Sequence, residues 1–184
     1  MRYMNIKFVI GLVVLLTVAG LAPASISVAR ASNNNVPDLP SPLCDTVRVS
    51  PENQLAFHVY ARGVQIYRWD GTAWVFVAPV ATLFADAGYH GQVGIHYAGP
   101  TWESNSGSKV VAARREGCSP DLTAIPWLLL QTVSTTGPGI FSSVTFIQRV
   151  NTTGGLAPSA PGSSIGAAVE VPYTAEYYFY RDEN

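Results

Sequence analysis

Residues 55–77 read LAFHVYARGVQIYRWDGTAWVFV, and this stretch decides the class of fold that the sequence predicts. Larger apolar side chains alternate with other residues over positions 55–61, which is the two-residue period of a strand with one buried face. Gly63 breaks this run, and strand character resumes over positions 64–69. Asp70-Gly71 is a strong signal for a tight hairpin turn, so we expect the chain to return through residues 73–77 as a neighbouring antiparallel strand.

The same pattern of strands and turns continues to the end of the chain. Short runs of β-branched and aromatic residues alternate with turn signals, and the sequence beyond residue 31 shows no convincing amphipathic helix of ten or more residues. About ten short strands at this spacing predict a single all-β domain, built as an antiparallel β-sandwich or a barrel-like fold. Periodicity alone does not distinguish a sandwich from a barrel.

The first residues have the pattern of an export signal. Arg2 and Lys7 precede the apolar run of residues 8–16, and Ala29-Arg30-Ala31 supplies the small-x-small pattern that signal peptidase cleaves. Ala22-Pro23-Ala24 offers an alternative, earlier cleavage site. The apolar run is shorter than the roughly 20 residues that a membrane-spanning helix needs, so a removed signal peptide is favoured over a membrane anchor.

Removal of a signal peptide over residues 1–31 leaves a flexible leader, residues 32–42, and an all-β domain, residues 43–184. The leader is polar and proline-bearing, so it buries too little apolar surface to offset the entropy of ordering it. Three of the eleven basic residues leave with the signal and none of the twelve acidic ones, which gives a formal net charge of −4. That charge argues against nucleic acid or an anionic membrane as partner. We expect a secreted or periplasmic protein, without a membrane span once the signal is removed, whose partner is extracellular or in the envelope.

Cys44 and Cys118 are the two cysteines of the chain. In an oxidising compartment, two thiols in a small domain most simply pair, which predicts a disulfide closing a loop of about 74 residues. Neither cysteine belongs to a CxxC motif or lies at a metal-ligand spacing from a histidine, so the pair is poor evidence for zinc or for a thiol nucleophile.

The segment richest in chemistry reads GIHYAGPTWE, residues 94–103. His96 and Glu103 flank its Gly-Pro turn, so the two side chains could converge as a general base with its orienting carboxylate. With His58 as a third group they could instead hold a divalent metal. The alternative is a histidine hydrogen-bonded to backbone, with Glu103 paired to an arginine such as Arg149. The spacing matches no established ligand pattern, so no catalytic residue, metal or cofactor is assigned beyond this alternative set.

The aromatic residues of the same segment favour binding over catalysis. Tyr97, Thr101, Trp102 and Glu103 form the predicted binding site, because exposed rings can stack on sugars while polar neighbours bind hydroxyls. The alternative is that the rings fill the core and the sheet faces. Our first hypothesis is a non-catalytic module that binds a surface, matrix or carbohydrate partner. The second is a small extracellular enzyme or metal-binding protein that uses His96 and Glu103.

Five segments carry a resemblance to a known family, and they are residues 63–67 (GVQIY), 96–103 (HYAGPTWE), 124–130 (AIPWLLL), 147–155 (IQRVNTTGG) and 171–180 (VPYTAEYYFY). They resemble a family of secreted bacterial and fungal proteins catalogued as domain of unknown function 3455. The resemblance spans nearly the whole chain after the signal and implies no established activity. Many relatives have cysteines at the positions of Trp69 and near Gly162, so their absence here leaves Cys44 and Cys118 as the candidate bridge. Some fungal relatives carry a malate dehydrogenase label, which this chain does not support because it lacks a G-x-G-x-x-G motif between a strand and a helix.

Overall fold

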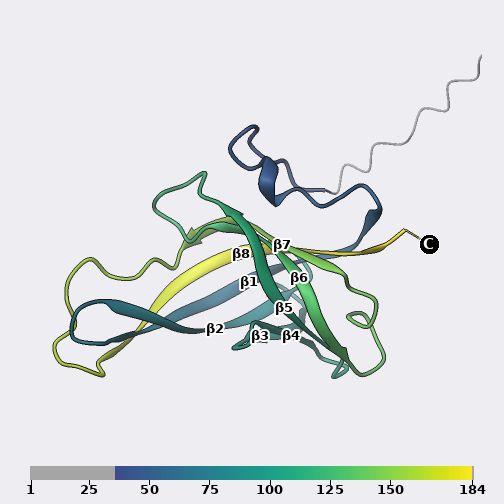
Figure 1. The fold of residues 1–184 in the computed structure, drawn as a ribbon. Coiled ribbons are helices and arrows are strands. Elements are labelled where there is room, and N and C mark those ends of the chain that lie inside the picture. Colours follow the sequence, from purple (N-terminus) through teal and green to yellow (C-terminus); the bar gives the residue numbers. More distant parts are fainter. Residues whose placement is uncertain (1–35, 184) are drawn as a thin grey trace, which may run out of the picture. The chain divides into compact units, whose positions relative to one another are not determined.

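The computed structural model describes residues 36–183, so the predicted signal peptide and the first part of the predicted leader lie outside the described residues. A short 3-10 turn, η1 (Asp45–Val47), precedes the strands. The eight strands are β1 (Asn53–Trp69), β2 (Trp74–Phe84), β3 (Gln92–Tyr97), β4 (Thr101–Ser104), β5 (Lys109–Cys118), β6 (Trp127–Thr136), β7 (Phe146–Gly154) and β8 (Ala168–Asp182) (Figure 1). Within this part of the chain, no helix is long and apolar enough to cross a membrane.

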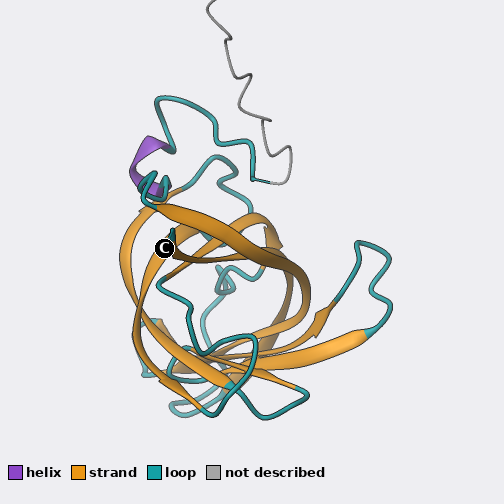
Figure 2. Cartoon of the chain, turned by 90° about the vertical axis from the view of Figure 1, so that its right-hand side faces the viewer, coloured by secondary structure: helices purple, strands orange, loops and turns teal. Residues whose placement is uncertain are grey.

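The strands form one antiparallel sheet that closes into a barrel. Each strand pairs with the next one in sequence, and β8 pairs with β1 along most of their length. Figure 2 shows the resulting ring of strands. The all-β prediction is therefore confirmed, and of the two architectures left open the barrel is the one formed. Closure pairs both edges of the sheet, which removes the exposed edge strands that an open sheet would carry.

The first strand is longer than the sequence pattern predicts. The expected break at Gly63 is wrong, because β1 runs through it for 17 residues and Gly63 pairs with Ala81 of β2. An ideal Cβ at Gly63 would lie 2.1 Å from the Val80 carbonyl oxygen, so this glycine permits a close approach of two backbones. The hairpin at Asp70 is confirmed, since its backbone N–H donates to the Ala73 carbonyl oxygen at 3.1 Å.

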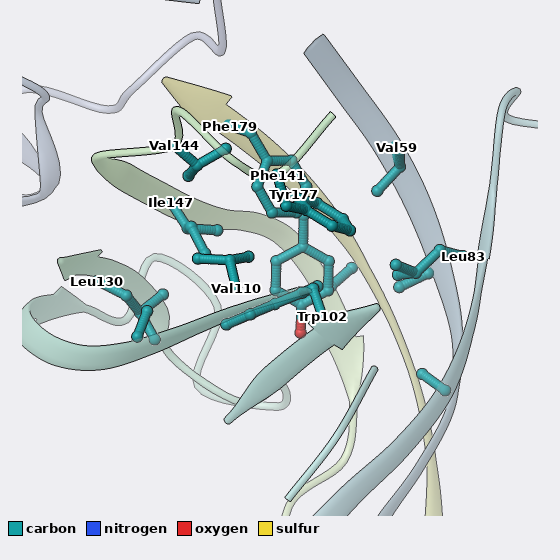
Figure 3. Close-up of a cluster of buried hydrophobic side chains, with 14 of the residues drawn as sticks. Val59, Leu83, Trp102, Val110, Leu130, Phe141, Val144, Ile147, Tyr177 and Phe179 are labelled. Carbon is teal, nitrogen blue, oxygen red and sulfur yellow. The ribbon is translucent and has the colours of Figure 1, made fainter. Parts of the chain in front are cut away.

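The inward-facing side chains of the barrel form its main core. Phe179 of β8 stacks on Phe57 of β1 with ring centroids 4.6 Å apart, and the ring of Trp102 meets Tyr177 edge to face. Phe141 and Val144, from the connection between β6 and β7, insert into the same cluster (Figure 3). This connection therefore fills one end of the barrel with apolar side chains.

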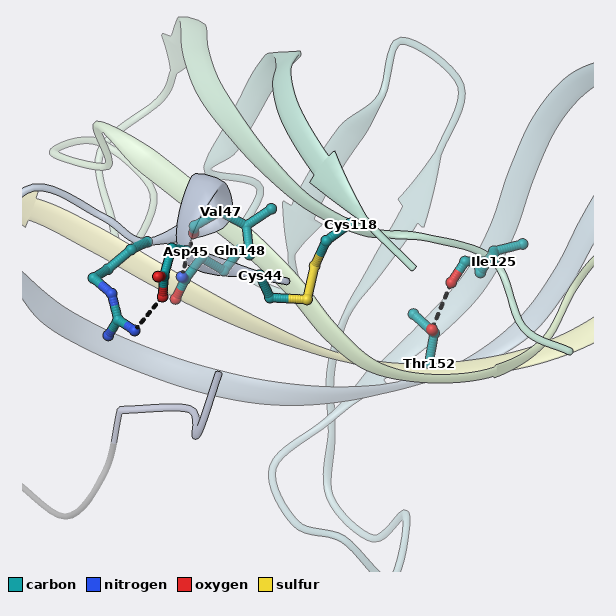
Figure 4. The surroundings of a disulfide bond; sticks show 8 residues. Cys44, Asp45, Val47, Cys118, Ile125, Gln148 and Thr152 are labelled. Atoms are coloured by element: carbon teal, nitrogen blue, oxygen red, sulfur yellow. Dashed lines mark hydrogen bonds and ion pairs between the residues drawn. A yellow bond between two sulfur atoms is a disulfide. The ribbon is translucent and has the colours of Figure 1, made fainter. Parts of the chain in front are cut away.

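The outer face of β6, β7 and β8 is covered by the segment that precedes β1. The buried residues there are Leu39, Cys44, Val47, Cys118, Trp127, Leu129, Val150, Tyr178 and Tyr180. The predicted disulfide between Cys44 and Cys118 is present, and the Gln148 side-chain amide donates to the Val47 carbonyl oxygen at 2.6 Å (Figure 4). Leu39, which the sequence places in the leader, is buried in this cluster.

Candidate functional site

The structure places His96 and Glu103 on opposite faces of the sheet. His96 of β3 pairs with Trp102 of β4, and both side chains point into the barrel, 3% and 1% exposed. Glu103 is the next residue along β4, and because strand side chains alternate it faces outward. The convergence of His96 and Glu103, one of the alternatives that the sequence leaves open, is therefore not formed, since the turn between them sets a register that separates them.

On the outer face, Glu103 belongs to a surface cluster. The Tyr97 hydroxyl donates to Glu103 Oε2 at 2.9 Å, and Lys109 Nζ lies 3.1 Å from the same oxygen. The bond from Tyr97 and then the Lys109 ammonium lower the pKa of the Glu103 carboxyl. The partner of Glu103 is thus Lys109 and not Arg149, and the carboxylate has no contact with the interior of the barrel.

His58, the third residue of the predicted metal set, also lies on the outer surface. Its Nε2 is 2.9 Å from Glu176 Oε2, and its ring stacks on Tyr178 with centroids 4.1 Å apart. His58, His96 and Glu103 thus occupy separate environments. Among residues 36–183, no group of three or more His, Cys, Asp or Glu side chains is placed to hold a metal ion.

His96 is a neutral histidine inside the barrel. Its Nδ1 lies 2.8 Å from the Thr101 carbonyl oxygen, which accepts a hydrogen bond, so Nδ1 carries the proton and Nε2 is left as an acceptor. Burial lowers the pKa of His96 to about 3. The ring stacks on Trp102 at 4.3 Å between centroids and meets Tyr177 edge to face. The backbone-bonded histidine, one of the alternatives that the sequence leaves open, is the arrangement observed.

A cavity of about 260 Å³ lies beside this pair of rings. Every strand contributes to its lining, and the residues are Gln65, Phe76, Val77, Pro79, His96, Ala98, Gly99, Pro100, Trp102, Arg114, Leu128, Leu130, Arg149 and Tyr177. Most come from the ends of the strands joined by the β1–β2, β3–β4, β5–β6 and β7–β8 connections. The cavity therefore lies toward the barrel end opposite the one filled by Phe141 and Val144.

Three of the lining residues have a buried polar atom that makes no hydrogen bond of good geometry with the described part of the chain. They are Gln65 Nε2, Trp102 Nε1 and the Tyr177 hydroxyl. Leaving such an atom unpaired costs roughly 1–3 kcal/mol, so native proteins keep few of them and usually for a reason. Burial also raises the pKa of Tyr177, which keeps its hydroxyl protonated and able to donate.

Two arginines supply the charge at the cavity. Arg149 of β7 donates from Nε and Nη2 to the Pro126 carbonyl oxygen at 3.1 and 2.8 Å, which leaves Nη1 for another acceptor. Arg114 of β5 is exposed and lies at the rim. The positive charge of Arg149 also acts on the interior. Burial raises the pKa of Tyr177 and Arg149 opposes this effect, whereas burial and Arg149 both lower the pKa of His96.

Sequence reasoning found Trp102 and His96 but missed the residues opposite them. Gln65, Arg149 and Tyr177 belong to β1, β7 and β8, far from Trp102 in the sequence, and only the closed sheet brings them to one cavity. For Gln65 the sequence did offer a signal, because a polar residue at an inward-facing strand position indicates a polar feature inside the barrel. Of the predicted binding residues, Tyr97 and Glu103 lie outside, whereas Trp102 lines the cavity and Thr101 holds His96 through its carbonyl.

Comparison with known proteins places the barrel within one family model. The model described as "Protein of unknown function (DUF3455)" matches residues 50–181, which include all eight strands except the last residue of β8. No curated protein and no solved structure matches the chain.

Proposed function

The chain belongs to this family of proteins of unknown function (DUF3455), and we propose that it is an exported, non-catalytic binding protein that holds a small molecule in the barrel cavity. One observation carries the proposal. The cavity of about 260 Å³ is lined by three residues whose buried polar atoms make no hydrogen bond of good geometry with residues 36–183, even though the Tyr177 hydroxyl lies near the side chains of Tyr173 and Arg149. A bound molecule that met these atoms would remove the cost of leaving them unpaired.

The proposal moves the binding role of Trp102 from the surface to the interior. A flat platform for a surface, matrix or carbohydrate partner needs exposed rings, whereas the side chain of Trp102 is almost completely buried. Trp102 lines the cavity, and its indole N–H is itself buried. The proposed ligand is therefore a molecule small enough to enter the cavity, and not the surface, matrix or carbohydrate partner that the sequence first suggested.

A binding role is favoured over the enzyme alternative for a geometric reason. The enzyme alternative gives His96 an orienting carboxylate in Glu103, and Glu103 lies on the opposite face of the sheet from His96. His96 also commits Nδ1 to a backbone carbonyl and stays neutral, so its Nε2 can accept a hydrogen bond from a ligand. In the proposed role, His96 and Trp102 form one wall of the cavity.

Export is supported by the signal pattern of the first 31 residues and by the disulfide. Stable disulfides belong mainly to oxidising compartments, so the Cys44–Cys118 bridge fits a secreted or periplasmic protein. The intact mass of the protein recovered outside the cytoplasm tests this part of the proposal. A chain that begins after Ala31 or Ala24 is expected, and an unprocessed chain confined to the cytoplasm would contradict export.

Binding is tested by nuclear magnetic resonance of the indole N–H groups. Trp102 Nε1 has no hydrogen-bond partner among residues 36–183, whereas Trp74 Nε1 donates to the Ala160 carbonyl oxygen at 2.8 Å and serves as an internal control. In a screen of chemically diverse small molecules at about 1 mM, ligands are expected to shift the Trp102 signal and leave the Trp74 signal in place.

A matched pair of variants controls that screen. Ala98→Phe places a ring at a cavity-lining position and is expected to abolish the Trp102 shifts, whereas Ala113→Phe adds the same ring to an exposed position of β5 outside the lining. Compounds that bind equally well to both variants, or a screen without any shift of the Trp102 signal, would overturn the proposed function.

A further inference from the structure

Building on the proposed function, we infer that the ligand of the barrel cavity is a small planar organic anion, most simply an aromatic carboxylate. Its acid group meets Arg149, and its ring lies beside Trp102. Three features of the lining carry this inference: its charge, the kind of hydrogen-bonding atoms it leaves unpaired, and its shape.

The charge of the lining is positive although the protein as a whole is acidic. Arg114 and Arg149 line the cavity, and none of the described residues around it is Asp or Glu. The ion pairs between described residues also leave both arginines without a carboxylate partner. A guanidinium binds a carboxylate through parallel N–H groups, so a ligand with this group would neutralise the charge that the protein leaves uncompensated.

Apart from His96 Nε2, which accepts, the unpaired atoms of the polar lining residues are able to donate. Trp102 Nε1 is only a donor, the Gln65 side-chain amide nitrogen is only a donor, and the Tyr177 hydroxyl keeps its proton. An ionised carboxylate accepts hydrogen bonds and donates none, which matches this set. A neutral sugar would present hydroxyl donors as well, and the lining offers it no carboxylate oxygen as acceptor.

The remaining walls suit a flat apolar body of limited size. Trp102 and His96 stack at 14° between ring planes, and apolar lining comes from Leu128, Leu130 and Pro100. A cavity of about 150 Å³ already holds a benzene molecule, so 260 Å³ accommodates one or two fused rings with a single substituent. A long acyl chain or an oligosaccharide is larger than this space.

Calorimetric titration of the mature, disulfide-bonded protein with three matched probes tests the inference. Indole-3-carboxylate, indole-3-carboxamide and 3-(aminomethyl)indole share one ring and differ in the charge of the substituent. The carboxylate is expected to bind at least about ten-fold more tightly than the amide, with the amine weakest. Raising the salt concentration from about 0.05 M to about 0.5 M should weaken the binding of the carboxylate and leave the affinity for the amide unchanged.

Arginine variants show whether the preference arises at the proposed group. Arg149→Gln is expected to remove the ten-fold preference while changing the affinity for the amide by less than about two-fold. Arg115 is an exposed neighbour of Arg114 that lies outside the lining, so Arg115→Gln should leave the affinities for all three probes unchanged. Because Arg149 also bonds to Pro126, Arg149→Lys serves as a second variant, which keeps the charge and is expected to retain part of the preference.

The outcomes separate this inference from the proposed function. Equal affinity for carboxylate and amide, a preference that survives Arg149→Gln in a folded variant, or no binding of any probe would each overturn the anionic ligand. In those cases, a shift of the Trp102 indole signal by other compounds would still leave the binding function standing. If no compound shifted that signal, both proposals would fall.

Discussion

Removal of the Cys44–Cys118 bridge is expected to lower the free energy of unfolding by about 4 kcal/mol. The bridge closes a loop with a sequence separation of 74, and the chain-entropy relation gives about 4.4 kcal/mol at 25 °C for a loop of this length. The cross-link acts mainly on the unfolded chain, whose conformational freedom it restricts. The slope of the unfolding free energy against denaturant should also rise in its absence, because the unfolded chain exposes more surface.

The full effect requires that the segment before β1 stays docked without the bridge. Contacts besides the disulfide also hold this segment in place, and Leu39 is buried in the same cluster. Val47 is completely buried, and its carbonyl oxygen accepts the hydrogen bond from the Gln148 side chain. If the segment detached in the reduced protein, the folded state would relax and the measured loss would be smaller than 4.4 kcal/mol.

Urea unfolding of the oxidised protein, the reduced protein and the double variant Cys44→Ala/Cys118→Ala measures the loss. The reduced protein isolates the cross-link, and the variant adds the removal of two buried sulfur atoms. Hydrogen exchange of the Val47 backbone N–H, which donates to the Cys44 carbonyl oxygen at 3.2 Å, reports whether the segment is docked. A loss below about 1 kcal/mol with this N–H still protected would refute the chain-entropy argument.

Three further predictions concern single residues. Gly63→Ala is expected to destabilise the barrel by about 3 kcal/mol or more, because the added Cβ would clash with the backbone of β2. Gly107→Ala, whose Cβ would have nothing within 4 Å, should cost about 1 kcal/mol for its left-handed backbone alone. Similar thermal melting temperatures for the two variants would contradict this difference. The pKa of His96 is about 3 in the folded protein and about 6.5 in the unfolded chain, so between these values the unfolded chain binds more protons. The free energy of unfolding is therefore unaffected by His96 above pH 6.5 and falls by up to about 1.4 kcal/mol per pH unit as the pH decreases toward 3. His96→Gln should flatten that slope in urea titrations at pH 7 and 4.5, and equal slopes would rule out this origin. Gln148→Leu leaves two buried groups without their partner, the Val47 carbonyl oxygen and the Tyr180 hydroxyl that donates to Gln148 Oε1. It should cost roughly 1–3 kcal/mol for each group, and a negligible change in urea unfolding would show that the two bonds add nothing net.

The sequence predicted those features of the fold that depend on neighbouring residues. The hairpin at Asp70 follows from a dipeptide that favours one turn, and the all-β class follows from two-residue alternation. The break expected at Gly63 was wrong because a glycine within a strand has two explanations, a turn or a close backbone contact. Only the partner strand, which places the Val80 carbonyl against it, distinguishes them.

The candidate site could be predicted only in part for a related reason. His96 and Trp102 stood out because they lie within one short segment, and the structure keeps them together as a stacked cross-strand pair. Glu103 stood out equally and points the other way, because the register of the turn between β3 and β4 pairs it with Ile95. A shift of one residue in that register would have exchanged its face for that of Trp102.

By itself the sequence determined an all-β chain with one pair of cysteines, a turn at Asp70 and a cluster of chemically rich residues around Trp102. Each of these depends on interactions between residues close along the chain. Only the tertiary structure decided that the sheet closes, that β8 pairs with β1, and that Gln65 and Arg149 meet Trp102 at one cavity. Those contacts join strands far apart in sequence, and their register depends on hydrogen bonds and packing around the whole ring, which no local pattern encodes.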